Sequence, residues 1–305
     1  MTSAITRWII RRPTINIKLR EGASTDMTTG TLLPGIEIRD LHSNVLNQNL
    51  RLYVKLPWSY ERSSATHPVL FCLDGNRSFS LYSTMSLIYE TPGTNANEIL
   101  IVGIGYQLDA NRLRGLAQWA AWRTRDFLPR QRGEAEAYWK ERITPLMGGE
   151  EIQVQSGGAA LFLQSLQEEI IPFVEANYRA DPAERGLAGY SYSGLFALYT
   201  LLNAPQFFTR YFAGSPTMFD ELFEFEANYA SAHRDLQAQL FITAGSDETN
   251  LLEPIRGMVE LLQSRRYPGF KSWMHVFEDE GHVSAYAASV SRALRVLYYG
   301  GDRKD

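Results

Sequence analysis

Short runs made up mostly of apolar residues recur along this chain, separated by longer segments in which apolar residues follow a helical spacing. Such runs are typical of strands that are buried on both faces of a sheet. They cover residues 68–73, 99–104, 186–190, 239–244 and 272–277, with a shorter run at 211–214. The helical spacing covers residues 158–178, 195–202, 251–263 and 283–298. This alternation predicts an α/β protein with a mostly parallel sheet and helices on both faces.

Two parts of the chain depart from the alternation. Residues 36–57 contain two alternating apolar–polar segments around Asn-rich turn residues, which predicts a hairpin. Residues 107–157 hold three of the six tryptophans and no strand pattern, so we expect an inserted cap beside the functional site. We therefore expect one domain over residues 36–305. An N-terminal arm over residues 1–35 precedes it, and the alternation at residues 15–19 fits an edge strand.

One junction, at residues 186–195, joins an apolar run directly to a helical segment and reads G-L-A-G-Y-S-Y-S-G-L. A serine at such a strand–turn–helix junction is typical of a nucleophile elbow, where the residues two before and two after it must be small. For Ser191 these residues are Gly189 and Ser193, whereas for Ser193 the second would be Leu195, which is too large. Ser191 is therefore the predicted nucleophile, and a Gly/Ser-rich turn without catalysis is the alternative. Serine 193 stands where glycine is usual, and its hydroxyl is expected to reach a neighbouring backbone group.

A serine hydroxyl is a weak nucleophile and needs a base. The chain has five histidines, His42, His67, His233, His275 and His282. In the serine–acid–histidine order of an α/β hydrolase, the first two come too early in the chain. His233 precedes the best acid candidates, and His275 lies within a predicted strand. His282 follows a strand and precedes the last helix, so it is the predicted base; a solvent histidine in an acidic loop is the alternative.

The base in turn needs a carboxylate to orient it. Asp247 and Glu248 directly follow a predicted strand, and either could reach the imidazole. Asp247 could instead only cap the next helix, and a serine–histidine dyad without an acid stays open. The reaction also needs backbone N–H donors for an oxyanion. We expect one from Tyr192, directly after the serine, and one from Gly75 or Asn76, after the first buried strand.

Composition adds few constraints. A formal net charge of −4 over 305 residues favours neither nucleic acid nor an anionic membrane as a partner. The single cysteine, Cys72, lies in an apolar run and is expected to be a buried thiol, and no cysteine cluster suggests a metal. The apolar run at residues 8–10 is too short for a signal sequence or a membrane helix. A cytoplasmic soluble protein is expected.

Several short motifs, in this order along the chain, resemble the "putative esterase" family of the α/β-hydrolase fold. That family includes enterochelin-type siderophore esterases, S-formylglutathione hydrolase and feruloyl esterases. The motifs are R-L-Y-V-K-L-P (51–57), L-F-C-L-D-G-N (70–76), R-T-R-D-F-L-P (123–129), F-L-Q-S-L-Q-E-E-I-I-P-F-V-E-A-N-Y-R (162–179), L-A-G-Y-S-Y-S-G-L-F-A-L (187–198) and A-G-S-P-T-M-F (213–219). The resemblance spans the chain from about residue 36 to its end.

The resemblance implies a serine carboxylic-ester hydrolase that forms an acyl-enzyme and needs no cofactor. The family nucleophile falls on Ser191 and its base on His282. The family's G-x-x-E motif falls on Gly245–Glu248, which favours Glu248 over Asp247 as the acid, although some siderophore esterases lack an acid. Two other classes stay open: an acyltransferase that passes the same acyl group to an alcohol, and a binding protein on a hydrolase fold without catalysis.

The resemblance further implies a small-molecule ester as substrate, such as a siderophore lactone. Arg77 directly follows the expected oxyanion loop, and Arg123 and Arg125 lie near Trp122 in the insertion. A rim of arginines and aromatic rings would suit a bulky anionic ligand. The alternative is that these arginines only pair with carboxylates of the insertion.

Overall fold

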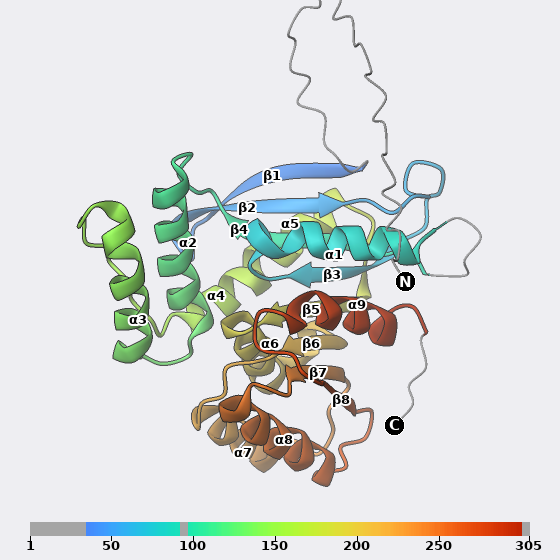
Figure 1. The fold of residues 1–305 in the computed structure, drawn as a ribbon. Coiled ribbons are helices and arrows are strands. Elements are labelled where there is room, and N and C mark those ends of the chain that lie inside the picture. Colours follow the sequence, from blue (N-terminus) through green and yellow to red (C-terminus); the bar gives the residue numbers. More distant parts are fainter. Residues whose placement is uncertain (1–34, 92–96, 301–305) are drawn as a thin grey trace, which may run out of the picture. The chain divides into compact units, whose positions relative to one another are not determined.

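The computed structural model describes residues 35–91 and 97–300. These residues form an 8-stranded sheet in the order β1-β2-β4-β3-β5-β6-β7-β8 (Figure 1). The strands are β1 (Ile36–Ser43), β2 (Gln48–Lys55), β3 (His67–Cys72), β4 (Leu100–Tyr106), β5 (Ala180–Tyr190), β6 (Arg210–Gly214), β7 (Gln239–Gly245) and β8 (Lys271–Phe277). The hairpin β1–β2 pairs antiparallel with itself and with β4, and all the other neighbours are parallel. The predicted α/β class with a mostly parallel sheet is confirmed.

Helices fill the connections between the parallel strands. They are α1 (Gly75–Tyr89), α2 (Arg112–Phe127), α3 (Gly133–Ile143), α4 (Ala159–Ser165), α5 (Ile171–Asn177), α6 (Tyr192–Asn203), α7 (Glu221–Ala232), α8 (Thr249–Ser264) and α9 (Ala285–Leu297). A π-helical turn joins α4 to α5, so the helix expected at residues 158–178 is present but interrupted. Helices α1 and α7 are additions that the apolar spacing does not predict. None of the helices in the described part of the chain is long and apolar enough to cross a bilayer.

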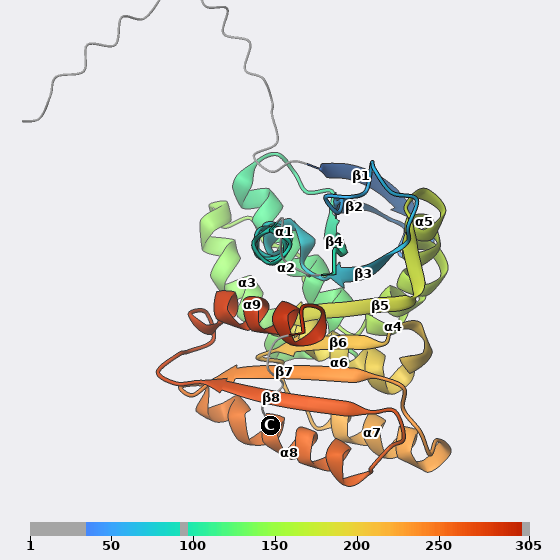
Figure 2. The ribbon, with the colours of Figure 1, turned by 90° about the vertical axis from the view of Figure 1, so that its right-hand side faces the viewer.

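The two faces of the sheet carry separate apolar clusters. On one face, α1 and α9 lie together and pack on Leu70, Cys72 and Ala188 (Figure 1). On the other, Val69 and Phe71 of the same strand β3 point into the larger cluster, which holds residues of α2, α4, α5 and α6. In Figure 2, α1 and α9 lie to the left of β3 and β4, and α5 lies to their right. Adjacent side chains of β3 thus serve opposite faces, as a strand buried on both sides requires.

The expected inserted segment contains α2 and α3 and no strand over residues 107–157. The side chain of Asn111, directly before α2, accepts hydrogen bonds from the backbone N–H groups of Leu113 and Arg114, which fixes where this helix begins. The expected arm over residues 1–35, and the edge strand within it, lie almost wholly outside the described residues.

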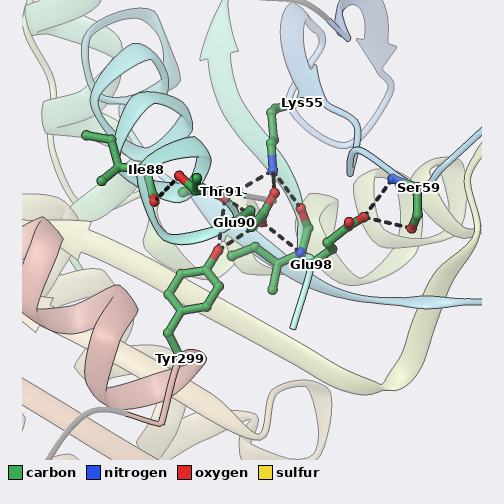
Figure 3. Close-up of polar contacts among 9 residues, drawn as sticks. Lys55, Ser59, Ile88, Glu90, Thr91, Glu98 and Tyr299 are labelled. Atoms are coloured by element: carbon green, nitrogen blue, oxygen red, sulfur yellow. Dashed lines mark hydrogen bonds and ion pairs between the residues drawn. The ribbon is translucent and has the colours of Figure 1, made fainter. Parts of the chain in front are cut away.

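A buried ion pair ties β2 to the end of α1 (Figure 3). The Lys55 side chain is fully buried, and its ammonium contacts the Glu90 carboxylate and lies 3.1 Å from Ser86 Oγ. Glu90 also accepts hydrogen bonds from the backbone N–H of Ile99 at 3.0 Å and from the Tyr299 hydroxyl at 2.9 Å. Burial lowers the pKa of Lys55, and the charge of Glu90 opposes that shift. The pair and its hydrogen bonds join four separate chain segments at this side of the sheet.

Candidate active site

The carboxyl ends of the parallel strands lie side by side and carry the polar residues of the candidate site. Tyr190 at the end of β5 pairs with Gly214 of β6, which pairs with Thr243 of β7, and the end of β7 pairs with Phe277 of β8. The residues that follow these strands, together with the one that follows β3, are Asp74, Ser191, Ser215, Glu248 and His282. Ligands bind at this edge in open α/β sheets, because the loops there converge from several strands.

Ser191 occupies a strained turn between β5 and α6. Its backbone has φ 64° and ψ −122°, a region that L-residues seldom adopt. A Cβ on Gly189 would lie 2.1 Å from the carbonyl oxygen of Ser193, so only glycine fits there. The crowding expected around a nucleophile elbow at Ser191 is therefore present, and the following helix starts at once with Tyr192.

The hydroxyl of Ser193 braces this turn. It accepts a hydrogen bond from the backbone N–H of Tyr190 at 2.9 Å, as expected for a hydroxyl that reaches a neighbouring backbone group. It also lies 2.8 Å from the carboxylate of Asp74, to which it can donate. Serine at this position thus connects the elbow to the loop after β3, a contact that glycine could not make.

Asp74 is the centre of a buried network. It has left-handed backbone angles, φ 56° and ψ 34°, directly before α1. Its carboxylate receives a bidentate pair from Arg123 at 2.8 and 2.9 Å and the indole N–H of Trp119 at 3.1 Å. Both partners come from α2, so the insertion is bonded to the loop after β3. A two-point arginine–carboxylate pair of this geometry is directional as well as strong.

Glu248 and His282 form the second polar centre. His282 Nδ1 lies 2.5 Å from Glu248 Oε1. The other carboxylate oxygen accepts from the Gly245 backbone N–H and from the Ser215 hydroxyl, each at 2.7 Å. Burial raises the pKa of Glu248, but these three hydrogen bonds outweigh it and hold the pKa below its ordinary value. Because a carboxylate can only accept, Nδ1 carries the hydrogen and Nε2 keeps a lone pair that can take a proton.

A cavity of about 540 Å³ lies above these residues. Ser191 and His282 both line it, with no hydrogen bond between their side chains among the described residues. Such contacts are often long before substrate binds. The insertion contributes lining residues from α2 and α3. The aromatic lining residues are Trp119, Tyr138, Trp139, Tyr190, Tyr192 and Tyr286.

The structure separates the two acid candidates. Glu248 is buried against His282, whereas Asp247 is exposed and its carboxylate lies only near Ser246 Oγ, at 3.4 Å. The histidines set aside from the sequence lie elsewhere; His275, for example, lies 3.4 Å from a guanidinium nitrogen of Arg292.

The expected substrate-binding residues fall into two groups. Arg77 lines the cavity, is exposed, and places its guanidinium 4.5 Å from the centre of the Trp119 ring. Arg123 also lines the cavity, but it is buried and committed to Asp74. Arg125 and Trp122 do not line it. The guanidinium of Arg125 pairs with Asp126 and Gln48, and Trp122 packs edge-on against Tyr106. Successive residues of a helix point in different directions, so neighbours in the sequence of α2 need not line the same cavity.

The expected oxyanion donors lie at two helix starts. Tyr192 is the first residue of α6 and lines the cavity, while Gly75 and Asn76 begin α1. The Asn76 side chain is used structurally, since it donates to the carbonyl of Tyr106 at 2.8 Å and accepts from its N–H at 2.7 Å. Asn76 can therefore donate to an oxyanion only through its backbone N–H. The first N–H groups of a helix have no partner within the helix, so this donor is free for that purpose.

Sequence reasoning missed Asp74, Tyr190 and Ser215. Each stands at or directly after the carboxyl end of a buried strand, in the motifs L-D-G-N, G-Y-S and A-G-S-P. A polar residue at that place in several strands was the available signal, because those ends meet at one edge of a parallel sheet.

Comparisons with known proteins concern the family and the fold of the chain. The family whose description is "Putative esterase" matches residues 126–286, which include Ser191, Glu248 and His282. Ferri-bacillibactin esterase BesA of Bacillus subtilis is 27% identical over 292 residues, or 89% of this chain and 94% of that protein. The siderophore triacetylfusarinine C esterase of Aspergillus fumigatus is 26% identical, over 76% of this chain and 81% of that protein. The solved BES protein from Bacillus cereus has a TM-score of 0.72 at 23% identity, over 90% of this chain and 99% of that one. The predicted α/β-hydrolase fold is confirmed.

Proposed function

Because this chain belongs to the "Putative esterase" family, we propose that it cleaves a carboxylic ester through an acyl-serine on Ser191, with His282 as the base and Glu248 as the acid. The chain is a serine ester hydrolase of that family. The identities of the three residues and of the ester are the proposal. The observation that carries it is the 2.5 Å contact between Glu248 and His282, beside a serine in a strained elbow.

The mechanism follows from the groups at the edge of the sheet. His282 Nε2 takes the proton of the Ser191 hydroxyl as its oxygen attacks the ester carbonyl. The tetrahedral oxyanion is held by the N–H of Tyr192 and by an N–H from Gly75 or Asn76. The imidazolium returns its proton to the leaving alcohol, and the Ser191 acyl-enzyme forms. Water, activated by the same imidazole, then releases the acid and restores the serine.

Glu248 acts without becoming protonated. Its carboxylate fixes the imidazole with hydrogen on Nδ1 and stabilises the positive charge that develops on His282. Its lowered pKa keeps it ionised well below neutral pH. Asp247, which faces solvent, has no part in this step.

The substrate proposed is a bulky ester with aromatic groups, such as a siderophore lactone. Two relatives are named as esterases of siderophores, and this cavity presents aromatic rings to its occupant. Arg77 is the cation available to an anionic group of the ligand, because Arg123 is already neutralised by Asp74. Arg125 and Trp122 are left out of the binding proposal. A cytoplasmic location stays a prediction from the sequence.

The nucleophile is tested with Ser191→Ala. This variant should lose p-nitrophenyl butyrate hydrolysis and labelling by a fluorophosphonate probe, because the only attacking oxygen is gone. Ser264→Ala, an exposed serine of α8, is the matched control and should keep both. Hydrolysis retained by Ser191→Ala would exclude Ser191 as the nucleophile.

The substrate is tested with a panel of purified esters. Iron-free and iron-loaded catecholate trilactones, hydroxamate esters, feruloyl esters and simple thioesters would be compared by kcat/KM. We expect the siderophore esters to be cleaved at least about tenfold more efficiently than the others, a difference of about 1.4 kcal/mol in the barrier. A preference for a thioester or a feruloyl ester would refute the siderophore proposal and leave the mechanism intact.

A further inference from the structure

His282 and three neighbouring residues form a closed ring of contacts. Glu248 Oε1 meets His282 Nδ1, and Glu248 Oε2 meets the Ser215 hydroxyl at 2.7 Å. The Ser215 hydroxyl lies 2.8 Å from the Tyr190 hydroxyl, and that hydroxyl lies 2.8 Å from the backbone carbonyl of His282. The ring therefore starts at the imidazole of His282 and returns to the backbone of the same residue.

The ring links segments at or just after the ends of four neighbouring strands of the sheet. Tyr190 ends β5, Ser215 follows β6, Glu248 follows β7, and His282 lies in the loop after β8. The loop of His282 is open to water, and its side chain is 41% exposed. Neighbouring Val283 is 85% exposed. Earlier in the same loop, the Glu280 carbonyl accepts from the N–H of Asp247 at 3.1 Å, and the N–H of Asp279 donates to Ser246 Oγ at 2.9 Å. The bond from the Tyr190 hydroxyl is the contact that reaches the carbonyl of His282 itself.

The ring of Tyr190 is itself fixed by packing. Its centre lies 4.3 Å from that of Tyr286 in α9. A Cβ on Gly214 would lie 2.3 Å from Cδ2 of Tyr190, so glycine at the end of β6 leaves the space that this ring fills. A hydroxyl on a ring held in this way has a defined position, and it can transmit that position to the His282 loop.

The two hydroxyls of the ring have fewer hydrogens to donate than there are contacts between oxygens. The Ser215 and Tyr190 hydroxyls supply two hydrogens for three oxygen contacts within the ring. The Glu248 carboxylate is the strongest acceptor, so it takes the Ser215 hydrogen. The Tyr190 hydrogen is then shared between Ser215 Oγ and the carbonyl of His282. Burial raises the pKa of Tyr190 to about 12, so this hydrogen stays on the tyrosine at neutral pH.

We propose that Tyr190 and Ser215 are positioning residues that set the location and orientation of His282 for proton transfer. Ser215 orients the carboxylate that holds Nδ1, and Tyr190 holds the backbone that carries the imidazole. The proposal rests on the proposed role of His282 as the base. Neither hydroxyl takes part in bond making, and both act through the geometry of the imidazole.

The test compares Tyr190→Phe and Ser215→Ala, which each remove one hydroxyl. We expect kcat for p-nitrophenyl butyrate to fall about 10- to 100-fold with a nearly unchanged KM, since small misplacements of a catalytic group cost that much. The double variant should lose little more than either single variant, because both belong to one ring. Tyr211→Phe is the matched control, since this buried hydroxyl in β6 has no hydrogen-bond partner within residues 35–91 and 97–300, and it should keep full kcat.

A spectroscopic measurement separates positioning from general loss of stability. The hydrogen between Nδ1 and Glu248 should give a far-downfield proton NMR resonance in the wild type and in Tyr211→Phe. The resonance should shift or broaden in Tyr190→Phe and Ser215→Ala, and disappear in Glu248→Gln. The other titratable side chains that line the same cavity are Asp74, Arg77, Arg123, Tyr138, Tyr192 and Tyr286, and none of these is changed.

The outcomes are distinct. Wild-type kcat and an unchanged resonance in both variants, with Ser191 still labelled by fluorophosphonate, would overturn the positioning role alone. Loss of Ser191 labelling in the wild type would overturn the proposed function instead. If Tyr190→Phe fails to fold by circular dichroism, Ser215→Ala carries the test by itself, and its wild-type kcat would overturn the proposal.

Discussion

Glu248→Gln is the substitution that tests the site most sharply, because no orientation of an amide suits all the partners of Glu248. His282 Nδ1 lies 2.5 Å from one oxygen, while Gly245 N and Ser215 Oγ lie 2.7 Å from the other. If the NH₂ group replaces the oxygen that faces His282, Nδ1 must accept a hydrogen bond, and the imidazole hydrogen moves to Nε2. If the NH₂ group replaces the oxygen that faces Gly245, two donors meet, because the backbone N–H of Gly245 also donates.

The magnitude follows from these two orientations. The first removes the reactive tautomer and the charge that stabilises the imidazolium; the comparable change in another serine hydrolase triad costs kcat about 10⁴-fold. The second keeps the tautomer and leaves a buried backbone donor unpaired, which costs about 1–3 kcal/mol of stability. We therefore expect kcat to fall about 10²- to 10⁴-fold, or about 2.7–5.4 kcal/mol in the barrier. KM should hardly change, because Glu248 is only 8% exposed and does not line the cavity.

The assay is the initial rate of p-nitrophenyl butyrate hydrolysis over a range of substrate concentrations, with stability measured by urea unfolding. Asp247→Asn is the matched control, since it makes the same chemical change at the exposed neighbouring position, and it should keep wild-type kcat. A kcat of Glu248→Gln within about threefold of the wild type would refute the reasoning and favour a Ser191–His282 dyad.

Three further predictions concern stability. Ser193→Ala should lower the free energy of unfolding by about 1–3 kcal/mol in urea, because the buried N–H of Tyr190 loses its acceptor; an unchanged midpoint would contradict this. Glu90→Gln should lower the free energy of unfolding by about 3–5 kcal/mol, because it leaves the buried charge of Lys55 unpaired. Adding Lys55→Met to this variant should restore most of the lost stability. If the two substitutions instead lower stability additively, the coupling is disproved. Burial raises the pKa of Glu169, but hydrogen bonds from Ser43 and nearby groups lower it overall. The ionised Glu169 carboxylate therefore stabilises the folded protein fully above the unfolded-state pKa of 4.5. This stabilisation is lost as the pH falls through the lower pKa of the folded state. The stability difference between the wild type and Glu169→Gln should shrink with acidification, and a constant difference would count against this role.

The sequence determined the class of the fold because its central strands are buried on both faces. A strand in that position is mostly apolar, so β3, β4 and β7 are visible as short apolar runs. The edge strand β8 is only partly buried, although its sequence has the same appearance. Helices α1 and α7 are not visible. The buried side of α1 is built largely from Gly75, Ser78, Ser83 and Ser86 around two aromatic residues, so it lacks an apolar spacing. Helix α7 buries Glu221 and Glu226 against arginines from distant segments, which hides its apolar face.

For the site, the sequence determined what depends on local sterics and on chain order. Crowding at the elbow singles out Ser191, because its neighbours at positions 189 and 193 are small. The order of elements singles out His282. The family motif favours Glu248, and the structure shows that this carboxylate is the one against His282.

Only the tertiary structure decided which polar groups pair with one another. Arg123 lies 49 positions from Asp74 and Ser193 lies 119 positions from it, so no local pattern records these contacts. The pairing removes Arg123 from the charges available to a ligand and leaves Arg77. In the same way, Tyr190 meets both Ser215 and the His282 loop only because the register of the sheet brings the ends of these strands together. A chain sequence fixes which side chains stand at strand ends, and the folding of the sheet decides which of them meet.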